Sequence, residues 1–372
     1  MSGEAAADLA HMRAALALAR RGLGETWPNP SVGCVLVREG RVVGRGATAP
    51  GGRPHAEVRA LEAAGAAARG ATAYVSLEPC CHWGATPPCT EALIAAGVAR
   101  VVVGTGDPDP RVNGAGIRRL REAGLDVTEG VLAAEAREIA AGFARRIAEG
   151  RPLVTLKLAT TLDGRIATHG GESRWITGEA ARRAVHLLRA GQDAVMVGIG
   201  TALADDPDLT CRLAGARRLP LVRVVADSHL RLPLTSRLVT TAGEAPLWLL
   251  HRPGADRLRR RALEELGVRL FEVAGDEAGL APGAALAALG EAGLTRVLVE
   301  GGARLAAALL HAGLVDRLVW FHAPGVMGGD GWPAAASFGI ETLARMPRFS
   351  RLGCREIGED LMSDYIRLPD PG

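Results

Sequence analysis

Residues 55–57 read His-Ala-Glu, and residues 79–89 read Pro-Cys-Cys-His-Trp-Gly-Ala-Thr-Pro-Pro-Cys. The imidazole of His55 and the thiolates of Cys80 and Cys89 are three firm zinc ligands, and they leave a fourth position open for water. Zinc held in this way lowers the pKa of its bound water to about 7, which supplies hydroxide at neutral pH. These two stretches therefore predict a catalytic zinc site.

The position of Glu57 separates a catalytic site from a structural one. It follows the histidine by two residues, too close for a natural fourth ligand, so its carboxylate can take a proton from the water and hand one to a departing amine. Zinc deaminases that act on nucleobases use this layout, although here eight residues separate Cys80 from Cys89. A closed structural site would need Cys81 or His82 as its fourth ligand and would not require the glutamate, so we favour catalysis.

Both parts of the motif stand where helices are expected to begin. Residues 56–68 are helical by composition and follow His55 directly, and Pro88 introduces a helix expected at 90–96. The amino end of a helix lowers the pKa of a nearby cysteine, which favours Cys89 as a thiolate.

The first half of the chain alternates strands with helices. Strands are expected at 31–37, 41–46, 71–77, 100–104 and 126–127, with helices at 1–23, 56–68, 90–96, 117–122 and 133–147. This rhythm indicates an α/β sheet with helices packed on it. The sequence Glu-Gly-Arg-Pro at 149–152 interrupts the pattern, and we place a domain boundary there, between residues 1–148 and 149–372.

A second α/β pattern follows the boundary. Strands are expected at 153–159, 194–198, 221–226, 247–250, 296–299, 318–322 and 363–368, with helices at 179–189 and 304–311. Further helices, without assigned bounds, are expected between the strands at 221–226, 247–250 and 296–299. No Gly-x-Gly-x-x-Gly follows the first of these strands, which argues against the usual dinucleotide fold. Gly301 and Gly302 lie between a strand and a helix, where backbone amides can hold a phosphate, although a tight connection is the more frequent explanation. The Ala/Gly-rich residues 275–290 give no clear prediction.

The composition limits the classes of function. Hydrophobic residues make up 48% of the 372 residues, and the formal net charge is +3. No block of basic residues and no ladder of aromatic residues suggests nucleic acid, whereas a small phosphorylated ligand fits this balance. No stretch approaches the roughly 20 apolar residues of a membrane helix. Three of the six cysteines lie within residues 80–89, which points to metal binding in a reducing cytoplasm.

Lys157 stands out because all the other residues among the 44 Lys and Arg are arginine. It lies between Leu156 and Leu158 on an expected strand. A compact ammonium on a flexible stem can do what a planar guanidinium cannot, and its pKa moves when it is buried. We interpret Lys157 as a substrate-binding group; the alternative is that biased drift spared one codon by chance.

Taken together, the motifs resemble those of the bifunctional deaminase/reductase family of riboflavin biosynthesis. The matching stretches are 27–33, 55–57, 78–89, 107–116, 157–165, 171–176, 203–207 and 299–302. They fall in the family's order and cover nearly the whole chain. There are departures: Cys81 stands where serine is expected, Ala85 where a basic residue is usual, and Asp109 where asparagine is usual.

The resemblance implies a cytidine-deaminase-like three-layer α/β domain over residues 1–148 and a dihydrofolate-reductase-like α/β domain over residues 149–372. The first would hydrolyse the 2-amino group of a diaminopyrimidinone that carries a ribosylamino phosphate. The second would use NADPH to reduce the ribosyl group of the deaminated product to the ribitylamino form. The implied cofactors are one zinc ion per chain and NADPH.

The resemblance also carries site residues over to this sequence. Substrate would be bound by Asn29 and His82 in the first domain and by Ser173, Arg189, Leu209, Arg212 and Glu300 in the second. NADPH would be bound by Ala159, Trp175, Thr201, Asp205 and Ser228. Some of these residues have a simpler alternative: Asn29 as a turn residue, each arginine as a solvated charge, and Trp175 as a core residue.

Three functions compete at this stage. The first is the bifunctional enzyme, and the second is a monofunctional deaminase whose reductase-like domain is an inactive scaffold. The third is a nucleic-acid deaminase, which would need a basic groove and stacking aromatics. We favour the first, with a phosphorylated pyrimidine as substrate, no nucleic acid or membrane partner, a homo-oligomeric state and a cytoplasmic location.

Overall fold

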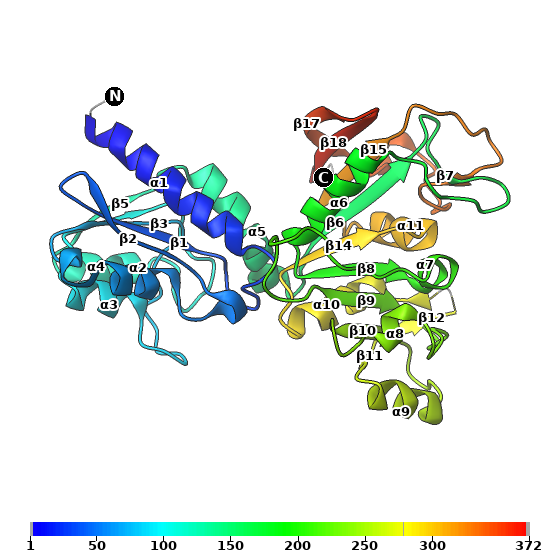
Figure 1. Ribbon diagram of the computed structural model, residues 1–372, viewed down its shortest axis with the longest axis horizontal. Coiled ribbons are helices and arrows are strands. Elements are labelled where there is room, and N and C mark those ends of the chain that lie inside the picture. Colours follow the sequence, from blue (N-terminus) through cyan, green and yellow to red (C-terminus); the bar gives the residue numbers. More distant parts are fainter. Residues whose placement is uncertain (1–2, 278, 370–372) are drawn as a thin grey trace. The chain divides into compact units, whose positions relative to one another are not determined.

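The computed structural model describes residues 3–277 and 279–369, and the chain divides into two compact units, Met1–Gly150 and Arg151–Gly372 (Figure 1). Each unit has its own sheet and its own buried core.

The amino-terminal unit contains a five-stranded sheet in the order β2-β1-β3-β4-β5. Its strands are β1 (Gly33–Arg38), β2 (Arg41–Ala47), β3 (Thr72–Val75), β4 (Arg100–Val103) and β5 (Asp126–Glu129). β1 pairs antiparallel with β2 and β3, whereas β3, β4 and β5 run parallel. Parallel strands end at the same edge of a sheet, so the segments that follow β3 and β4, with Cys80 and Asp107, start from one edge.

Helices cover both faces of this sheet, which confirms the three layers expected from the sequence (Figure 1). They are α1 (Gly3–Gly22), α2 (Ala56–Ala64), α3 (Cys89–Ala95), α4 (Ala115–Glu122) and α5 (Ala133–Glu149). On one face, Leu16 of α1 and Ile139 of α5 share a core with Val35 of β1. On the other face, Leu93 of α3 and Leu120 of α4 pack into the second core. Residues 1 and 2 of the expected first helix lie outside the described residues.

Gly46 lets α2 approach the sheet closely. A Cβ added to Gly46 would lie 2.0 Å from the carbonyl oxygen of Ala56, which is a clash with backbone that cannot move aside. Ala56 is the first residue of α2, directly after His55. The glycine in β2 therefore fixes how near the start of the metal-motif helix lies to the sheet.

The second unit is built on a nine-stranded sheet in the order β11-β10-β9-β8-β14-β6-β15-β18-β17. Its strands are β6 (Leu153–Thr160), β8 (Ala194–Gly198), β9 (Val222–Ala226), β10 (Leu247–His251), β11 (Arg269–Glu272), β14 (Arg296–Glu300), β15 (Arg317–His322), β17 (Phe349–Ile357) and β18 (Asp360–Arg367). Neighbours from β11 through β15 are parallel, and only the pairs β15–β18 and β18–β17 are antiparallel. Two short antiparallel pairs lie outside this sheet: β7 (Arg165–Ala167) with β16 (Trp332–Pro333), and β12 (Gly275–Asp276) with β13 (Gly279–Leu280).

The helices of the second unit pack on this sheet. They are α6 (Glu179–Ala190), α7 (Ile199–Asp205), α8 (Arg237–Thr240), α9 (Arg257–Glu265), α10 (Pro282–Glu291) and α11 (Ala303–His311). One core joins Leu238 of α8 and Leu263 of α9 to Val225 of β9. A second core joins Ala181 of α6 to Phe321 of β15.

Some elements differ from the sequence expectation. The helix expected at 56–68 ends at Ala64, because Gly65 adopts a φ of 53° in the left-handed region and a short 3-10 turn follows. Residues 275–290, which gave no clear prediction, form the β12–β13 pair and most of α10. The strands β7, β11, β16 and β17 and the helix α7 were not predicted. Helices α8 and α9 lie between strands where helices were expected without assigned bounds.

Two features mark the junction between the units: a left-handed backbone conformation at the end of α5 and a buried ion pair at the start of the second unit. Helix α5 ends at Gly150, whose φ of 68° lies in the left-handed region. Arg151 is buried in the second unit, because its guanidinium donates to both carboxylate oxygens of Asp316 at 2.7 and 2.9 Å. The division therefore falls between Gly150 and Arg151, two residues after the expected boundary.

We predict that polypeptides 1–150 and 151–372 fold when they are produced separately, because each holds a complete sheet with its own core. Cooperative thermal unfolding of each half, followed by circular dichroism, checks this expectation. Two insoluble or non-cooperative halves would show that the units depend on each other for stability.

Candidate active sites

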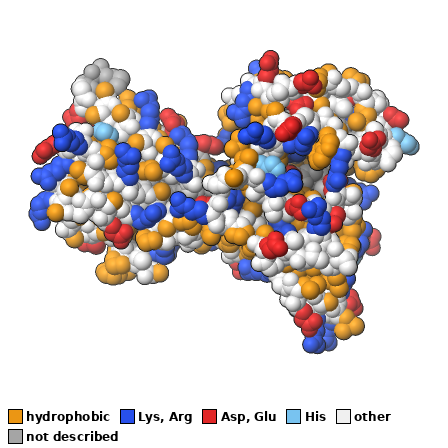
Figure 2. Space-filling view, viewed as in Figure 1, with side chains coloured by type: hydrophobic (Ala, Val, Ile, Leu, Met, Phe, Trp, Pro, Cys, Tyr) orange, Lys and Arg blue, Asp and Glu red, His pale blue; other side chains and the backbone are white. Residues whose placement is uncertain are grey.

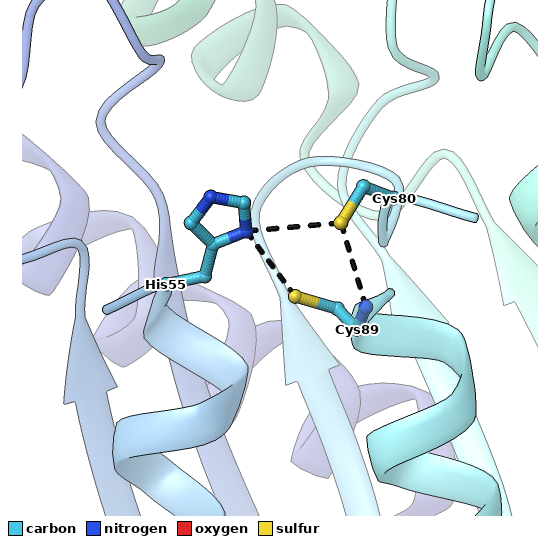
Figure 3. Close-up of side chains that lie close together, drawn as sticks. All are labelled: His55, Cys80 and Cys89. Atoms are coloured by element: carbon cyan, nitrogen blue, oxygen red, sulfur yellow. Dashed lines mark hydrogen bonds between the residues drawn. The ribbon is translucent and has the colours of Figure 1, made fainter. Parts of the chain in front are cut away.

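The three residues of the metal motif meet in space, as their spacing predicts. One ligand atom from each of His55, Cys80 and Cys89 lies within 4.8 Å of the others. The Nδ1 atom of His55 lies 3.3 Å from Sγ of Cys89 and 3.7 Å from Sγ of Cys80 (Figure 3). Within residues 3–277 and 279–369, this is the one group of three or more His, Cys, Asp or Glu side chains with such spacing.

Helix starts position two of the three side chains. His55 is the amino-terminal cap of α2, and Cys89 is the first residue of α3. Cys80 follows β3, and its Sγ accepts a hydrogen bond from the backbone amide of Cys89 at 3.4 Å. Figure 3 shows the three side chains converging from these separate segments. An imidazole and two thiolates suit zinc, so the residues present fit this metal.

The two thiols share their protons unequally. The hydrogen bond between the two side chains, with Cys89 as partner, is the largest cause that lowers the pKa of Cys80, to about 4. The same hydrogen bond, together with burial, raises the pKa of Cys89. Cys80 is therefore the thiolate of the pair before a metal binds, and a bound cation would favour the loss of the second proton.

Glu57 lies beside this group on the first turn of α2 and is buried, with 4% of its surface exposed. Burial raises its pKa to about 7, and the negative charge of Cys80 adds to that shift, whereas His55 opposes it. A carboxyl group that titrates near neutral pH can both accept and donate a proton there. The position fits the proton transfer expected from the sequence.

Cys81 does not join the three-residue group. Its thiol points to the backbone oxygen of Arg111, at 3.6 Å. The Nδ1 atom of His82 is buried and has no hydrogen-bond partner, and the charge of His82 acts on Asp109. Asn29 donates from its amide to the oxygen of Gly52 at 2.8 Å, which ties it to the segment before the metal motif.

Glu78 was missed by the sequence analysis. Its buried carboxylate accepts hydrogen bonds from the backbone amides of Asp107, Gly114 and Ile117, at 3.0 to 3.2 Å. It thereby ties the segment before Cys80 to the start of α4. Its place directly before Pro-Cys makes it part of the motif, but nothing in the sequence shows that its partners are backbone amides.

In the second unit, the predicted cofactor residues gather at one edge of the sheet. Ala159 lies near the carboxyl end of β6, Thr201 follows β8, Ser228 follows β9, and Gly301 and Gly302 follow β14. These four strands are neighbours and run parallel, so their carboxyl ends lie at the same edge. Ligands of open α/β sheets bind at this edge.

The Gly301–Gly302 turn requires glycine. Their φ values are 78° and 87°, and the turn leads into α11. A Cβ added to Gly302 would lie 3.3 Å from Oγ1 of Thr201, so Thr201 lies directly against the turn. The turn and Thr201 together form a small polar site at the start of a helix.

Lys157, Arg189 and Glu300 form a charged cluster. Arg189 binds the carboxylate of Glu300 with two hydrogen bonds, at 2.6 and 2.9 Å. Lys157 is the neighbour of Glu300 across the pair β6–β14. Burial lowers the pKa of Lys157, Glu300 opposes that shift, and Arg189 adds to it. The cluster holds two cations and one carboxylate at the expected substrate residues.

The remaining predicted residues are more dispersed. Trp175 is 69% exposed and lies against the guanidinium of Arg182, so it is not a core residue. Asp205 accepts a hydrogen bond from Arg174 on its backbone oxygen at 2.7 Å. The side chain of Leu209 is buried in the core, so only its backbone is available to a ligand.

Two further substrate candidates, Ser173 and Arg212, are exposed. Arg212 contacts the ring of His186 on α6, with Nε at 3.4 Å from Nε2. The structure thus keeps Arg212 at the side of α6, the helix that carries Arg189.

On the face drawn in Figure 2, positive charge is not gathered in one track. Basic side chains are scattered over the visible face of both units, with acidic side chains among them (Figure 2). Among the described residues, no helix combines the length and the apolar character that crossing a membrane requires.

The fold and the donor set define a class of protein, a zinc-dependent deaminase unit followed by an α/β unit of the reductase type. Residues 6–105 match the cytidine and deoxycytidylate deaminase zinc-binding region. Residues 152–363 match the RibD C-terminal domain. The expected fold class is confirmed for both units.

Full-length relatives identify the family. The chain is 43% identical to the riboflavin biosynthesis protein RibD of Escherichia coli, covering 95% of this chain and 98% of that protein. It is 41% identical to the Aquifex aeolicus protein of the same name, covering 97% and 98%. A solved structure of Acinetobacter baumannii RibD matches with a TM-score of 0.87 at 37% identity, over 98% of this chain and 100% of that one. The chain belongs to the RibD family of riboflavin biosynthesis proteins.

The enzyme is therefore bifunctional, with a zinc-dependent deaminase and an NADPH-dependent reductase that act on small phosphorylated pyrimidines. The monofunctional alternative is not favoured, because the relatives match over both units.

Proposed function

We propose that Glu57 moves the protons of the deamination, beside a zinc ion held by His55, Cys80 and Cys89. The observation that carries this proposal is a buried carboxyl group, with a pKa of about 7, adjacent to three convergent zinc ligands. A zinc ion held by these three residues would supply an acidified water as the nucleophile for deamination. Glu57 takes a proton from that water on a carboxylate oxygen and returns one to the departing amine, which leaves as ammonia.

Two side chains of the same unit are proposed to bind the pyrimidine. Asn29 is held by its hydrogen bond to Gly52, on the segment that precedes His55. His82 has a buried ring nitrogen without a partner, which a substrate group can satisfy. Both residues belong to segments that flank the metal ligands.

In the second unit, we propose that Ala159, Thr201, Ser228 and the turn Gly301–Gly302, which gather at one edge of the sheet, would hold NADPH. Trp175 and Asp205 complete this set. NADPH supplies the hydride that opens the ribosyl group of the deaminated product.

The carboxylate of Glu300, held by Arg189, and the ammonium of Lys157 bind the substrate. Ser173, Arg212 and the backbone of Leu209 complete the substrate set.

The cellular setting is also a proposal. All six cysteines are free thiols, and Cys80 and Cys89 must stay reduced to bind zinc, which supports a cytoplasmic location. We also propose a homo-oligomer, supported by exposed apolar side chains such as Leu352 of β17 and Leu187 of α6.

One experiment tests both activities. The purified protein should contain about one zinc ion per chain, release ammonia from the aminopyrimidine phosphate, and oxidise NADPH when given the deaminated product. Fluorescence titration with NADPH separates the bifunctional enzyme from a deaminase with an inactive scaffold. Absence of zinc would contradict the deaminase assignment, and absence of NADPH binding would contradict the reductase assignment.

A further inference from the structure

Arg53 places a positive charge beside the metal motif. It lies two residues before His55, on an exposed segment that leads into α2. Its Nη1 donates a hydrogen bond to the hydroxyl of Thr86 at 2.8 Å. Thr86 belongs to the loop 81–88, which connects the two cysteine ligands. One arginine thus links the two segments that carry all three metal ligands.

The charge of Arg53 reaches the metal ligands themselves. The hydrogen bond with Cys80 is the largest cause that raises the pKa of His55, and Arg53 acts in the opposite direction.

The loop 81–88 contains no lysine or arginine. It reads Cys-His-Trp-Gly-Ala-Thr-Pro-Pro, and Ala85 is exposed next to Thr86. The second terminal nitrogen of Arg53, Nη2, lies 3.7 Å from the position that a Cβ on Gly84 would occupy. The guanidinium therefore lies against a stretch of loop that holds no lysine or arginine.

Two other arginines near the motif, Arg111 and Arg59, are engaged elsewhere. Arg111 binds the carboxylate of Asp109, with its closest contact at 2.6 Å. Arg59 donates to the backbone oxygen of Ala47 at 2.9 Å. Arg53, by contrast, forms no ion pair with any carboxylate of the described residues. Its charge remains available to an anion.

We propose that Arg53 binds the phosphate of the deaminase substrate and sets the preference of this unit for phosphorylated over dephosphorylated pyrimidines. The planar guanidinium can donate two hydrogen bonds to phosphate oxygens. Thr86 holds the Nη1 side of the group, and the donors on Nη2 and Nε have no protein partner among the described contacts. The inference rests on the deaminase activity proposed above.

The test compares the phosphorylated substrate with the same compound lacking its phosphate. Arg53→Ala should raise the KM for the phosphorylated substrate at least about tenfold, because hydrogen bonds between charged groups are among the stronger ones. The kcat should change little, since the phosphate is remote from the reacting carbon. Deamination of the dephosphorylated compound should be unaltered. Arg53→Lys, which keeps the charge, should retain most of the preference.

Arg118→Ala is the matched control, because Arg118 is an exposed arginine of α4 whose charge acts on Cys81. It should leave both substrates unaffected, and zinc content should be equal in all variants. An equal loss with both substrates in Arg53→Ala would assign Arg53 a purely structural role and overturn the inference. An unchanged preference for the phosphorylated substrate in Arg53→Ala would also overturn the inference. Loss of that preference in Arg118→Ala would overturn it as well. Wild-type protein that deaminates neither compound would instead refute the proposed function itself.

Discussion

Glu57→Gln should lower the deaminase rate by about 10²–10⁴, the usual contribution of a general acid or base. The amide has nearly the same shape as the carboxyl group but cannot take a proton from the attacking water. Because Glu57 is not one of the three residues with metal-ligand spacing, zinc content should stay at about one per chain. Ammonia release under single-turnover conditions measures the effect.

Two controls make this result specific to the proton transfer. Glu62→Gln changes an exposed glutamate on the same helix and should leave the rate unaltered. Reduction of the deaminated product by the Glu57→Gln protein should also be normal, because that reaction is assigned to the second unit. A normal deaminase rate in Glu57→Gln would show that another group moves the proton.

The metal site could be predicted because the identity of its residues carries the chemistry. Three soft or imidazole ligands on two short stretches leave few alternatives to zinc, and the proline before Cys89 marks a helix start. The role of Glu78 could not be predicted in the same way. Its three hydrogen-bond donors are backbone amides, which are present at nearly every position and leave no mark on the sequence.

The side-chain partners of Arg53 and Arg189 could not be predicted from the sequence either. Arginine is so abundant in this chain that no single one stands out, and a pairing such as Arg189 with Glu300 joins residues 111 positions apart. The sequence analysis placed Arg189 and Glu300 at the substrate, but it had no signal for the contact between them.

The unpredicted strands share a physical cause. In β17, most side chains are exposed, so the alternation of apolar and polar residues that indicates a half-buried strand is absent. Its position depends on backbone pairing with β18, which is a long-range property. The central strands β8, β10 and β14 are buried on both faces and appear in the sequence as continuous apolar runs, which is why they were predicted.

Lys157→Arg should lower the rate of reduction at least tenfold, which corresponds to about 1.4 kcal/mol of transition-state stabilisation. Lys157 lies beside the Arg189–Glu300 ion pair, and burial lowers its pKa. A guanidinium is larger and planar, so at this site it would compete with Arg189 for the same carboxylate and would displace the donor from the substrate oxygen. Steady-state rates of NADPH oxidation with the deaminated substrate measure the effect.

Arg261→Lys is the matched control for this exchange, because it swaps the same two side chains on the exposed surface of α9, where Arg261 pairs with Glu265. It should leave reduction unaltered. Lys157→Arg should retain deamination and the affinity for NADPH, so that the loss appears in the reduction step alone. An unaltered reductase rate would mean that this lysine was spared by chance. A loss confined to the reductase would mean that Lys157 was retained because a compact ammonium binds the substrate. At the other positions, where a solvated charge is enough, arginine serves equally well.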